Sequence, residues 1–171
     1  EDRPRIERGP VNIHEVMHHV VKLAKNGFGR DTQFVENYDP SLPPSYGDRD
    51  QMVQVFLNLV KNAVEAIPET RSGEVSITTA FQHGVKMAAS HGAAAVHLPL
   101  VVTVQDNGEG IPDDLKPHLF DPFITTKQGG TGLGLALVGK LVGDHGGVID
   151  YDSSTQGTSF RVMLPMLKEH I

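Results

Sequence analysis

Apolar residues recur every three or four positions in three stretches of the chain, and this spacing predicts three helices. The helices cover residues 11–24, about 49–67, and 133–142. The second is apolar on most sides, which indicates that it is buried. Pro68 ends it, because proline lacks the N–H group that would continue the helix.

Polar residues at the starts of the first two helices predict N-terminal caps. Asn12 and Asp48 have side chains that accept from the free N–H groups of a first helical turn. Glu15 and Gln51 follow three residues later, the spacing of a capping box, in which the second side chain accepts from the N–H of the capping residue. We therefore expect reciprocal bonds at both helix starts.

Five shorter stretches have the alternation or the β-branched content of strands. The order along the chain is helix, strand, helix, two strands, helix and two strands. This order predicts an α/β (α+β) two-layer sandwich, with a mixed, largely antiparallel sheet and helices on one of its faces. The predicted strands are residues 32–38, 74–81, 98–105, 148–152 and 159–164.

Three segments lack a regular pattern. Residues 1–10 hold two prolines and predict an extended segment that leads into the domain. Residues 82–98, rich in Ala, Gly and His, predict a flexible loop, and residues 112–130 predict a lid. Residues 1–171 show no internal repeat and no second composition, so we expect a single domain. The first five residues look like a start inside a longer protein.

The overall composition argues against several classes of protein. The net charge of −6, without a Lys/Arg block, argues against nucleic acid as a partner. The absence of cysteine excludes disulfides and thiolate metal sites, and it fits a reducing compartment, so we expect a cytoplasmic location. No apolar run approaches the ~20 residues of a membrane-spanning helix, so we expect no span in this chain.

Two glycine-rich stretches are the strongest candidates for a binding site. The first is Asp106-Asn107-Gly108-Glu109-Gly110-Ile111, and the second is Gly129-Gly130-Thr131-Gly132-Leu133-Gly134-Leu135, which opens the third helix. Glycine N–H groups can close on phosphate oxygens, and a helix N-terminus adds unpaired donors. The Asp106 carboxylate is better suited to accept from an amine, such as the exocyclic amino group of adenine. The two stretches together predict a nucleotide site.

Asn58 and Asn62 are two amides on the otherwise apolar second helix. They are four residues apart and therefore share a face, with Glu65 near it. A buried amide without a partner is costly, so we favour a binding role for this face. The alternative is that both are polar positions of a solvated helix face.

Five stretches, in this order, resemble the ATP-binding catalytic domain of histidine kinases (GHKL ATPases), whose Bergerat fold is shared with gyrase and mismatch-repair ATPases. The resemblance covers about residues 11–164, and the F box favours the kinase branch. The stretches are Asn58-Leu59-Val60-Lys61-Asn62-Ala63 (N box), Asp106-x-Gly108-x-Gly110-Ile111 (first glycine box), Leu119-Phe120-Asp121-Pro122-Phe123 (F box), Gly130-Thr131-Gly132-Leu133-Gly134-Leu135 (second glycine box) and Gly157-Thr158-Ser159-Phe160 (last box).

The finer texture is similar to the nitrogen-regulation sensor kinases of the NtrB type. This similarity rests on Pro10-Val11-Asn12-Ile13-His14-Glu15-Val16, Tyr38-Asp39-Pro40-Ser41-Leu42-Pro43-Pro44 and Gln54-Val55-Phe56-Leu57-Asn58-Leu59. The resemblance implies a two-component sensor kinase module that delivers the ATP γ-phosphate to a histidine on a separate dimerisation domain, absent here. The chain would then bind Mg-ATP but not phosphorylate itself. A response regulator and a PII-type signal protein are the other implied partners.

The resemblance also implies roles for individual residues. Asn62 would coordinate Mg²⁺ through its amide oxygen, a hard ligand of the kind this cation prefers. Asn58 would face the phosphates or a metal-bound water, and Lys127 would meet the β- or γ-phosphate as a mobile charge. These three are the expected catalytic residues. Asp106 would accept from the adenine amino group, and Thr158 would reach adenine directly or through water.

The expected contacts with ATP and the expected lining of its pocket form a larger set. Apolar members are expected to line the base pocket or to anchor the lid, with plain core packing as the alternative, and Phe120 belongs with them. The ATP contacts are Asn58, Asn62, Asp106, Gly108, Gly110, Ile111, Phe123, Thr125, Lys127, Gly130, Thr131, Gly132, Leu133, Gly134, Leu135 and Thr158.

Other interpretations are weaker. The chain could be a module that mainly docks a PII-type regulator, or another ATPase of this fold such as an anti-sigma serine kinase. The stretch His14-Glu15-Val16-Met17-His18 matches the zinc-protease pattern H-E-x-x-H, but no third ligand is placed convincingly. Residues 134–140 approach a P-loop, but Leu141 replaces the Ser or Thr that would hold Mg²⁺.

Overall fold

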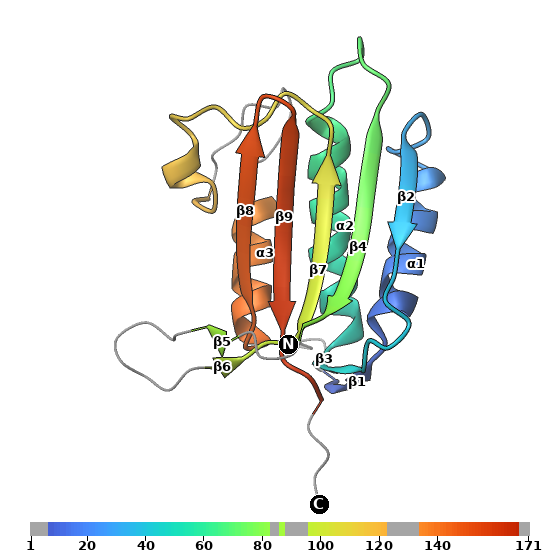
Figure 1. Cartoon of the computed structure of the whole chain (residues 1–171), viewed down its shortest axis with the longest axis vertical. Coiled ribbons are helices and arrows are strands. Elements are labelled where there is room, and N and C mark those ends of the chain that lie inside the picture. Colours follow the sequence, from blue (N-terminus) through green and yellow to red (C-terminus); the bar gives the residue numbers. More distant parts are fainter. Residues whose placement is uncertain (1–6, 83–85, 88–95, 123–133, 168–171) are drawn as a thin grey trace, which may run out of the picture.

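A five-stranded sheet with three α-helices on one face makes up most of the described chain (Figure 1). The computed structural model describes residues 7–82, 86–87, 96–122 and 134–167. The strand order is β2-β4-β7-β9-β8; β2 is parallel to β4, and the other neighbours are antiparallel. The predicted mixed, largely antiparallel two-layer sandwich is therefore confirmed. The strands are β2 (Gln33–Asn37), β4 (Glu74–Phe81), β7 (Leu100–Asp106), β8 (Val148–Ser154) and β9 (Gly157–Leu164).

The three predicted helices form. They are α1 (Ile13–Lys25), α2 (Arg49–Glu65) and α3 (Gly134–Asp144). Helix α2 packs against both other helices and against β4 and β7, so it is the centre of the helical layer. Phe56 and Leu59 of α2 are fully buried in the core between helices and sheet. Polar side chains carried by α2 are therefore held on a rigid support.

Both helix caps form, but the reciprocal halves of the capping boxes do not. The Asn12 side chain accepts from the N–H groups of His14 and Glu15, and the Asp48 side chain accepts from that of Gln51. Glu15, however, pairs with Arg49, with Oε1 2.6 Å from Nη2. The N–H of Asp48 donates to His145, the residue after α3, instead of Gln51. In both cases a partner from a distant part of the chain replaces the local one.

A second, two-stranded sheet lies below the main one and was not predicted. Strand β1 (Gly9–Val11) pairs antiparallel with β3 (Ser45–Gly47). Residue Met166, near the C-terminal end, forms a bridge with Ser45. Three-residue strands are too short to show a period, and their pairing depends on contacts between segments far apart in the sequence.

Besides residues 1–10, where β1 begins, the other two segments that were predicted to be irregular also contain short elements. In residues 82–98, β5 (Lys86–Met87) pairs antiparallel with β6 (Val96–His97), where a flexible loop was expected. In the expected lid, η1 (Lys116–His118) forms one turn of 3₁₀ helix. Elements of two or three residues are too short to show a hydrophobic pattern that distinguishes them from loops.

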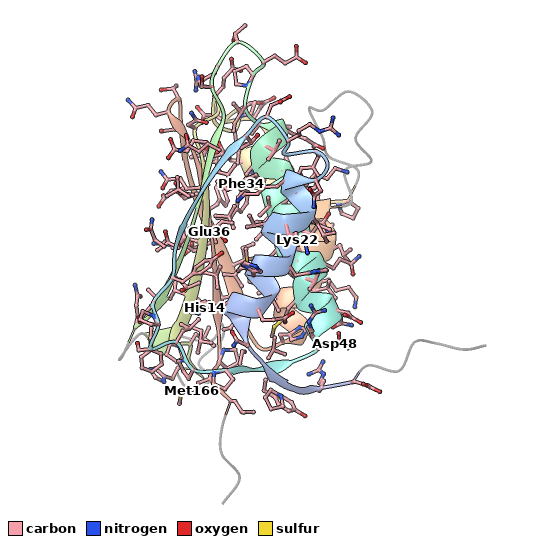
Figure 2. The ribbon with its side chains drawn as sticks, turned by 90° about the vertical axis from the view of Figure 1, so that its right-hand side faces the viewer. His14, Lys22, Phe34, Glu36, Asp48 and Met166 are labelled. Carbon is pink, nitrogen blue, oxygen red and sulfur yellow. The ribbon has the colours of Figure 1, made fainter. Side chains whose placement is uncertain are left out.

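The H-E-x-x-H stretch lies on α1, and its first two residues contact other side chains of the same domain. The His14 ring (labelled in Figure 2) contacts β4 and the residue after β2: its Nε2 is 2.8 Å from the Thr79 hydroxyl, and its ring stacks on Tyr38 at 4.9 Å. Glu15 is engaged by Arg49, and His18 is exposed. Among the described residues, no three His, Asp or Glu side chains are grouped in a way that could hold a metal. The stretch is a helix start packed on the sheet.

His14 gives a pH-dependent contribution to stability. Burial lowers its pKa, and nearby Asp39 partly opposes this. The unfolded chain then binds a proton more readily than the folded chain, so stability is present above the ordinary value near 6.5 and is lost as the pH falls. We expect the melting temperature of His14→Gln to fall less than that of wild type between pH 7.5 and pH 5.5. The exposed His18→Gln is the control, and an unchanged pH dependence in His14→Gln would contradict the assignment.

Candidate nucleotide-binding site

Asp106, the last residue of β7, is a buried carboxylate held by backbone donors. It is 5% exposed, and its Oδ1 accepts from the N–H of Gly108 at 2.8 Å and of Thr158 at 3.3 Å. The first bond comes from its own loop and the second from β9. Both bonds hold Oδ1 in place, so the carboxylate is a candidate for a preorganised acceptor.

A chain of hydroxyl groups lies beside this carboxylate. Thr158 is 3% exposed, and its hydroxyl is 2.8 Å from that of Ser153. The Ser153 oxygen also accepts from the N–H of Ile111, at 2.7 Å. Ser153 was not predicted as a site residue. The signal that could have identified it is its position directly opposite Thr158 in the β8–β9 hairpin.

Two glycines of the first glycine-rich stretch allow close backbone approaches. A Cβ on Gly108 would overlap the backbone oxygen of Ala66, just after α2. Gly110 has φ +87°, which glycine adopts readily, and a Cβ there would overlap the backbone oxygen of Ser154. The stretch is therefore wedged between the end of α2 and the β8–β9 hairpin.

Arg71 ties the same stretch to the segment after α2. Its guanidinium donates to the backbone oxygens of Asn107 and Gly108, the latter at 3.0 Å. The Asn107 side chain donates to the Ser72 oxygen at 2.9 Å and accepts from the N–H of Glu74 at 3.0 Å. Sequence spacing gave no sign of this role for Arg71, because the contact spans 36 residues of sequence.

We expect Gly108→Ala to destabilise the protein by about 1–3 kcal/mol, because the added methyl group overpacks against the Ala66 carbonyl. ATP binding should weaken as well, since the Gly108 N–H would be moved away from Asp106. Urea denaturation measures the first effect, and calorimetric titration the second.

Gly143→Ala is the matched control. Gly143 lies in α3 with no atom within 4 Å of an added Cβ, so alanine should be neutral or stabilising there. Equal stability changes in the two variants would contradict the close approach at Gly108.

Asn58 and Asn62 face the first residue of α3. A Cβ on Gly134 would lie 3.4 Å from Asn58 Oδ1 and 3.9 Å from Asn62 Nδ2. Asn58 also donates from its Nδ2 to the Gln54 backbone oxygen at 2.9 Å, which leaves Oδ1 directed at α3. The structure thus brings the two predicted asparagines to the helix start that the second glycine-rich stretch leads into.

The two halves of the site lie along one side of α2. Asn58, Asn62 and Ala66 are spaced by four residues, so they follow one face of the helix. Asn58 is next to Gly134, and Ala66 is next to Gly108. At 1.5 Å per residue the eight positions span about 12 Å along the helix. The Asp106 loop and the two asparagines thus lie at different heights along one face of α2.

Phe120 attaches the start of the expected lid to the body of the fold. Its ring centroid is 6.4 Å from that of Tyr151 on β8, and Tyr151 is 5.9 Å from Phe160 on β9. The Tyr151 hydroxyl donates to the Lys116 backbone oxygen at 3.2 Å. These contacts fit either lid anchoring or plain core packing for Phe120, which also packs against the main core.

The other predicted site residues either pack against the core or lie outside the described part of the chain, and the P-loop-like stretch can also be placed. Ile111 and Leu135 are half-buried and pack against the main core. Lys140 lies on α3 and pairs with Asp144, so the P-loop-like stretch is a helix and not a phosphate-binding loop. Outside the described residues lie Phe123, Thr125, Lys127, Gly130, Thr131, Gly132 and Leu133.

Comparison with known families and curated proteins identifies similar chains. The family of histidine kinase-, DNA gyrase B-, and HSP90-like ATPases matches residues 47–168. Sensory histidine kinase/phosphatase NtrB of Azospirillum brasilense is 61% identical over 168 residues, which are 98% of this chain and 42% of that protein. NtrB of Rhizobium leguminosarum bv. phaseoli is 54% identical over 169 residues, 99% and 44% of the two chains. The chain thus spans less than half the length of these relatives.

Solved structures agree with this grouping. The nucleotide-free catalytic domain of histidine kinase ThkA superposes with a TM-score of 0.73 at 31% identity, covering 93% of this chain and 97% of that one. ThkA in complex with the response regulator TrrA superposes with a TM-score of 0.72 at 28% identity, covering 95% and 42%. The resemblance proposed from the sequence motifs is therefore confirmed.

Proposed function

Because the chain belongs to the family of histidine kinase-, DNA gyrase B- and HSP90-like ATPases, we propose that it is the ATP-binding catalytic domain of a two-component sensor histidine kinase in nitrogen regulation. The observation that carries this proposal is the buried Asp106 carboxylate near one end of α2. Asn58 and Asn62 lie on the same face of that helix, next to the start of α3. The identity of 61% to an NtrB protein supports the nitrogen-regulation assignment.

In this proposal the adenine lies at Asp106. The carboxylate accepts from the exocyclic amino group, and the hydroxyls of Thr158 and Ser153 complete the polar edge of the base site. Gly108 and Gly110 leave room for the ring. The specificity for adenine then follows from the carboxylate, which can accept but cannot donate.

The phosphates lie at the start of α3, where the first N–H groups of the helix and its dipole favour an anion. Asn62 is suited to hold Mg²⁺, because its amide lies at this helix start and offers a hard oxygen ligand. When bound, Mg²⁺ supplies neutralisation of the phosphate charge. Asn58 orients the phosphates or a metal-bound water, and Lys127 adds a cation.

The phosphoryl acceptor is a histidine on a separate dimerisation domain. Phosphoryl transfer depends mainly on positioning and charge neutralisation, which fits a module that holds ATP and presents its γ-phosphate. A response regulator, a PII-type signal protein and the chain's own dimerisation domain are the proposed partners, and the cytoplasm is the proposed location. No helix among the described residues is long and apolar enough to cross a membrane.

The test is a calorimetric titration of this chain with a non-hydrolysable ATP analogue, with and without Mg²⁺, and with a GTP analogue as control. We expect binding of the ATP analogue, strengthened by Mg²⁺ and much tighter than that of the GTP analogue. With radiolabelled ATP, phosphohistidine should form on an added dimerisation domain and not on this chain alone. Absence of ATP binding, or self-phosphorylation of the chain, would contradict the proposal.

A further inference from the structure

His145 follows directly after α3 and links two helices through its ring. It is 6% exposed. Its Nδ1 is 2.8 Å from the Leu141 backbone oxygen, and its Nε2 is 3.1 Å from the backbone nitrogen of Asp48. A carbonyl oxygen only accepts, so Nδ1 carries the proton and Nε2 accepts from the Asp48 N–H. The two bonds together select one neutral tautomer of the ring.

These bonds join the start of α2 to the end of α3. Asp48 is the capping residue of α2 (labelled in Figure 2), and Leu141 lies in the last turn of α3. The ring also packs on the bare backbone of Gly47, where a Cβ would overlap ring atom Cδ2. His145 is therefore a cross-link between two helices that the sequence pattern predicted separately.

The Asp48 N–H has a local acceptor that it does not use. In a capping box it would donate to Gln51, three residues on. Gln51 Oε1 is instead buried and has no hydrogen-bond partner among the described residues. A buried acceptor without a partner costs stability. The bond between the helices is thus kept at the expense of a local one, which indicates that the α2–α3 arrangement itself matters.

The other ends of the same two helices form the phosphate end of the site. Gly134, at the start of α3, faces Asn58 and Asn62 of α2. With 11 residues, α3 is about 16 Å long. If α3 tilted by about 4° about its His145 end, Gly134 at the other end would move sideways by about 1 Å. A misplacement of about this size can change the function of a site by up to 100-fold.

We propose that His145 is a positioning residue for nucleotide binding, which sets the separation between the α2 asparagines and the start of α3. This inference rests on the proposed ATP site. It assigns no contact with the nucleotide to His145. Its effect is confined to the phosphate end, because Asp106 and Thr158 are placed by β7 and β9 and not by α3.

The experiment compares the affinities of ATP and adenosine for variants of this chain. In His145→Leu both ring bonds are lost. We expect ATP binding to weaken by about 10-fold or more and adenosine binding to change by less than threefold. His145→Gln, whose amide has a donor and an acceptor, should restore part of the ATP affinity. ATP is measured by calorimetric titration with Mg²⁺, and adenosine by NMR titration.

The control for general destabilisation is Val20→Ala. Val20 is fully buried in α1, and α2 lies between α1 and α3. It should lower the melting temperature and leave the ratio of ATP to adenosine affinity unchanged. If His145→Leu does not fold, His145→Asn is measured instead. Its shorter amide should reach Leu141 and not Asp48, so we expect the same selective loss of ATP affinity.

The outcomes are distinct. An equal loss of ATP and adenosine affinity in His145→Leu would overturn the positioning role. So would a change in the ratio of the two affinities in Val20→Ala as large as that in His145→Leu. Imidazolium nitrogen shifts for His145 in NMR spectra at neutral pH would also overturn it. Wild-type chain that fails to bind ATP would refute the proposed function instead.

Discussion

The Asp106→Asn variant should bind ATP about 100-fold more weakly than wild type and keep its fold. Its retained oxygen can still accept from the N–H groups of Gly108 and Thr158, which hold Asp106 Oδ1. An NH₂ group replaces the other oxygen and would face the adenine amino group, donor against donor. A hydrogen bond to a charged group contributes about 1.5–3 kcal/mol, and every 1.4 kcal/mol is tenfold in affinity. Calorimetric titration gives both affinities.

A change of base provides the sharpest control. Inosine triphosphate carries a carbonyl oxygen where ATP carries the amino group, so the new amide of Asp106→Asn can donate to it. We expect wild type to prefer ATP and Asp106→Asn to shift toward inosine triphosphate. Asp106→Ala, in contrast, leaves two buried N–H groups without their acceptor and should also lower the melting temperature. Unchanged base preference in Asp106→Asn would refute the adenine assignment.

The Asn62→Ala variant should lose about 10- to 100-fold in affinity for ATP in the presence of Mg²⁺, and little in its absence. The reason is that the proposed role of Asn62 is as a ligand of the cation, so its loss removes the benefit of Mg²⁺ rather than the binding of the base. Helix stability should not suffer, because alanine is a better helix former than asparagine. The measurement is ATP titration across a series of Mg²⁺ concentrations.

Lys61→Ala is the matched control, since Lys61 is the exposed neighbour of Asn62 on the same helix. Its Mg²⁺ dependence should equal that of wild type. Should Asn62→Ala keep the full Mg²⁺ dependence, or should Lys61→Ala lose it, the metal assignment would be wrong and Asn62 would be a structural amide.

The parts of the fold that could be predicted are those written in local patterns. The period of α2 and the Asp106-x-Gly108-x-Gly110 spacing lie within short stretches of sequence. The structure confirms the helix, and the nucleotide site that the glycine spacing indicates stays a prediction. The asparagines could be named because two amides stand out on an apolar helix. Their proximity to Gly134 could be expected only through the family resemblance, because helix packing brings together residues more than 70 positions apart.

What could not be predicted depends on competition between local and distant partners. Glu15 leaves its capping box for Arg49, and the Asp48 N–H leaves its own for His145. Local spacing describes only one of the two competitors. Arg71 was missed for the same reason, since it acquires its role from a loop that is distant in sequence. Ser153, in contrast, could have been found from its place opposite Thr158 in the β8–β9 hairpin. The roles of Lys127 and the second glycine-rich stretch stay predictions.

Strand β3 is hydrogen-bonded to two segments that lie far apart in the sequence. Val11 of β1 pairs with Ser45, and Met166 near the other end of the described chain bridges to the same residue (Figure 2). The Ser45 hydroxyl donates to the Pro165 oxygen at 2.9 Å. Neither β1 nor the segment around Met166 can separate from the fold without β3 losing a neighbour. Tension applied through β1 or through the Met166 segment would therefore be passed to β3, and α2 begins two residues after β3 ends.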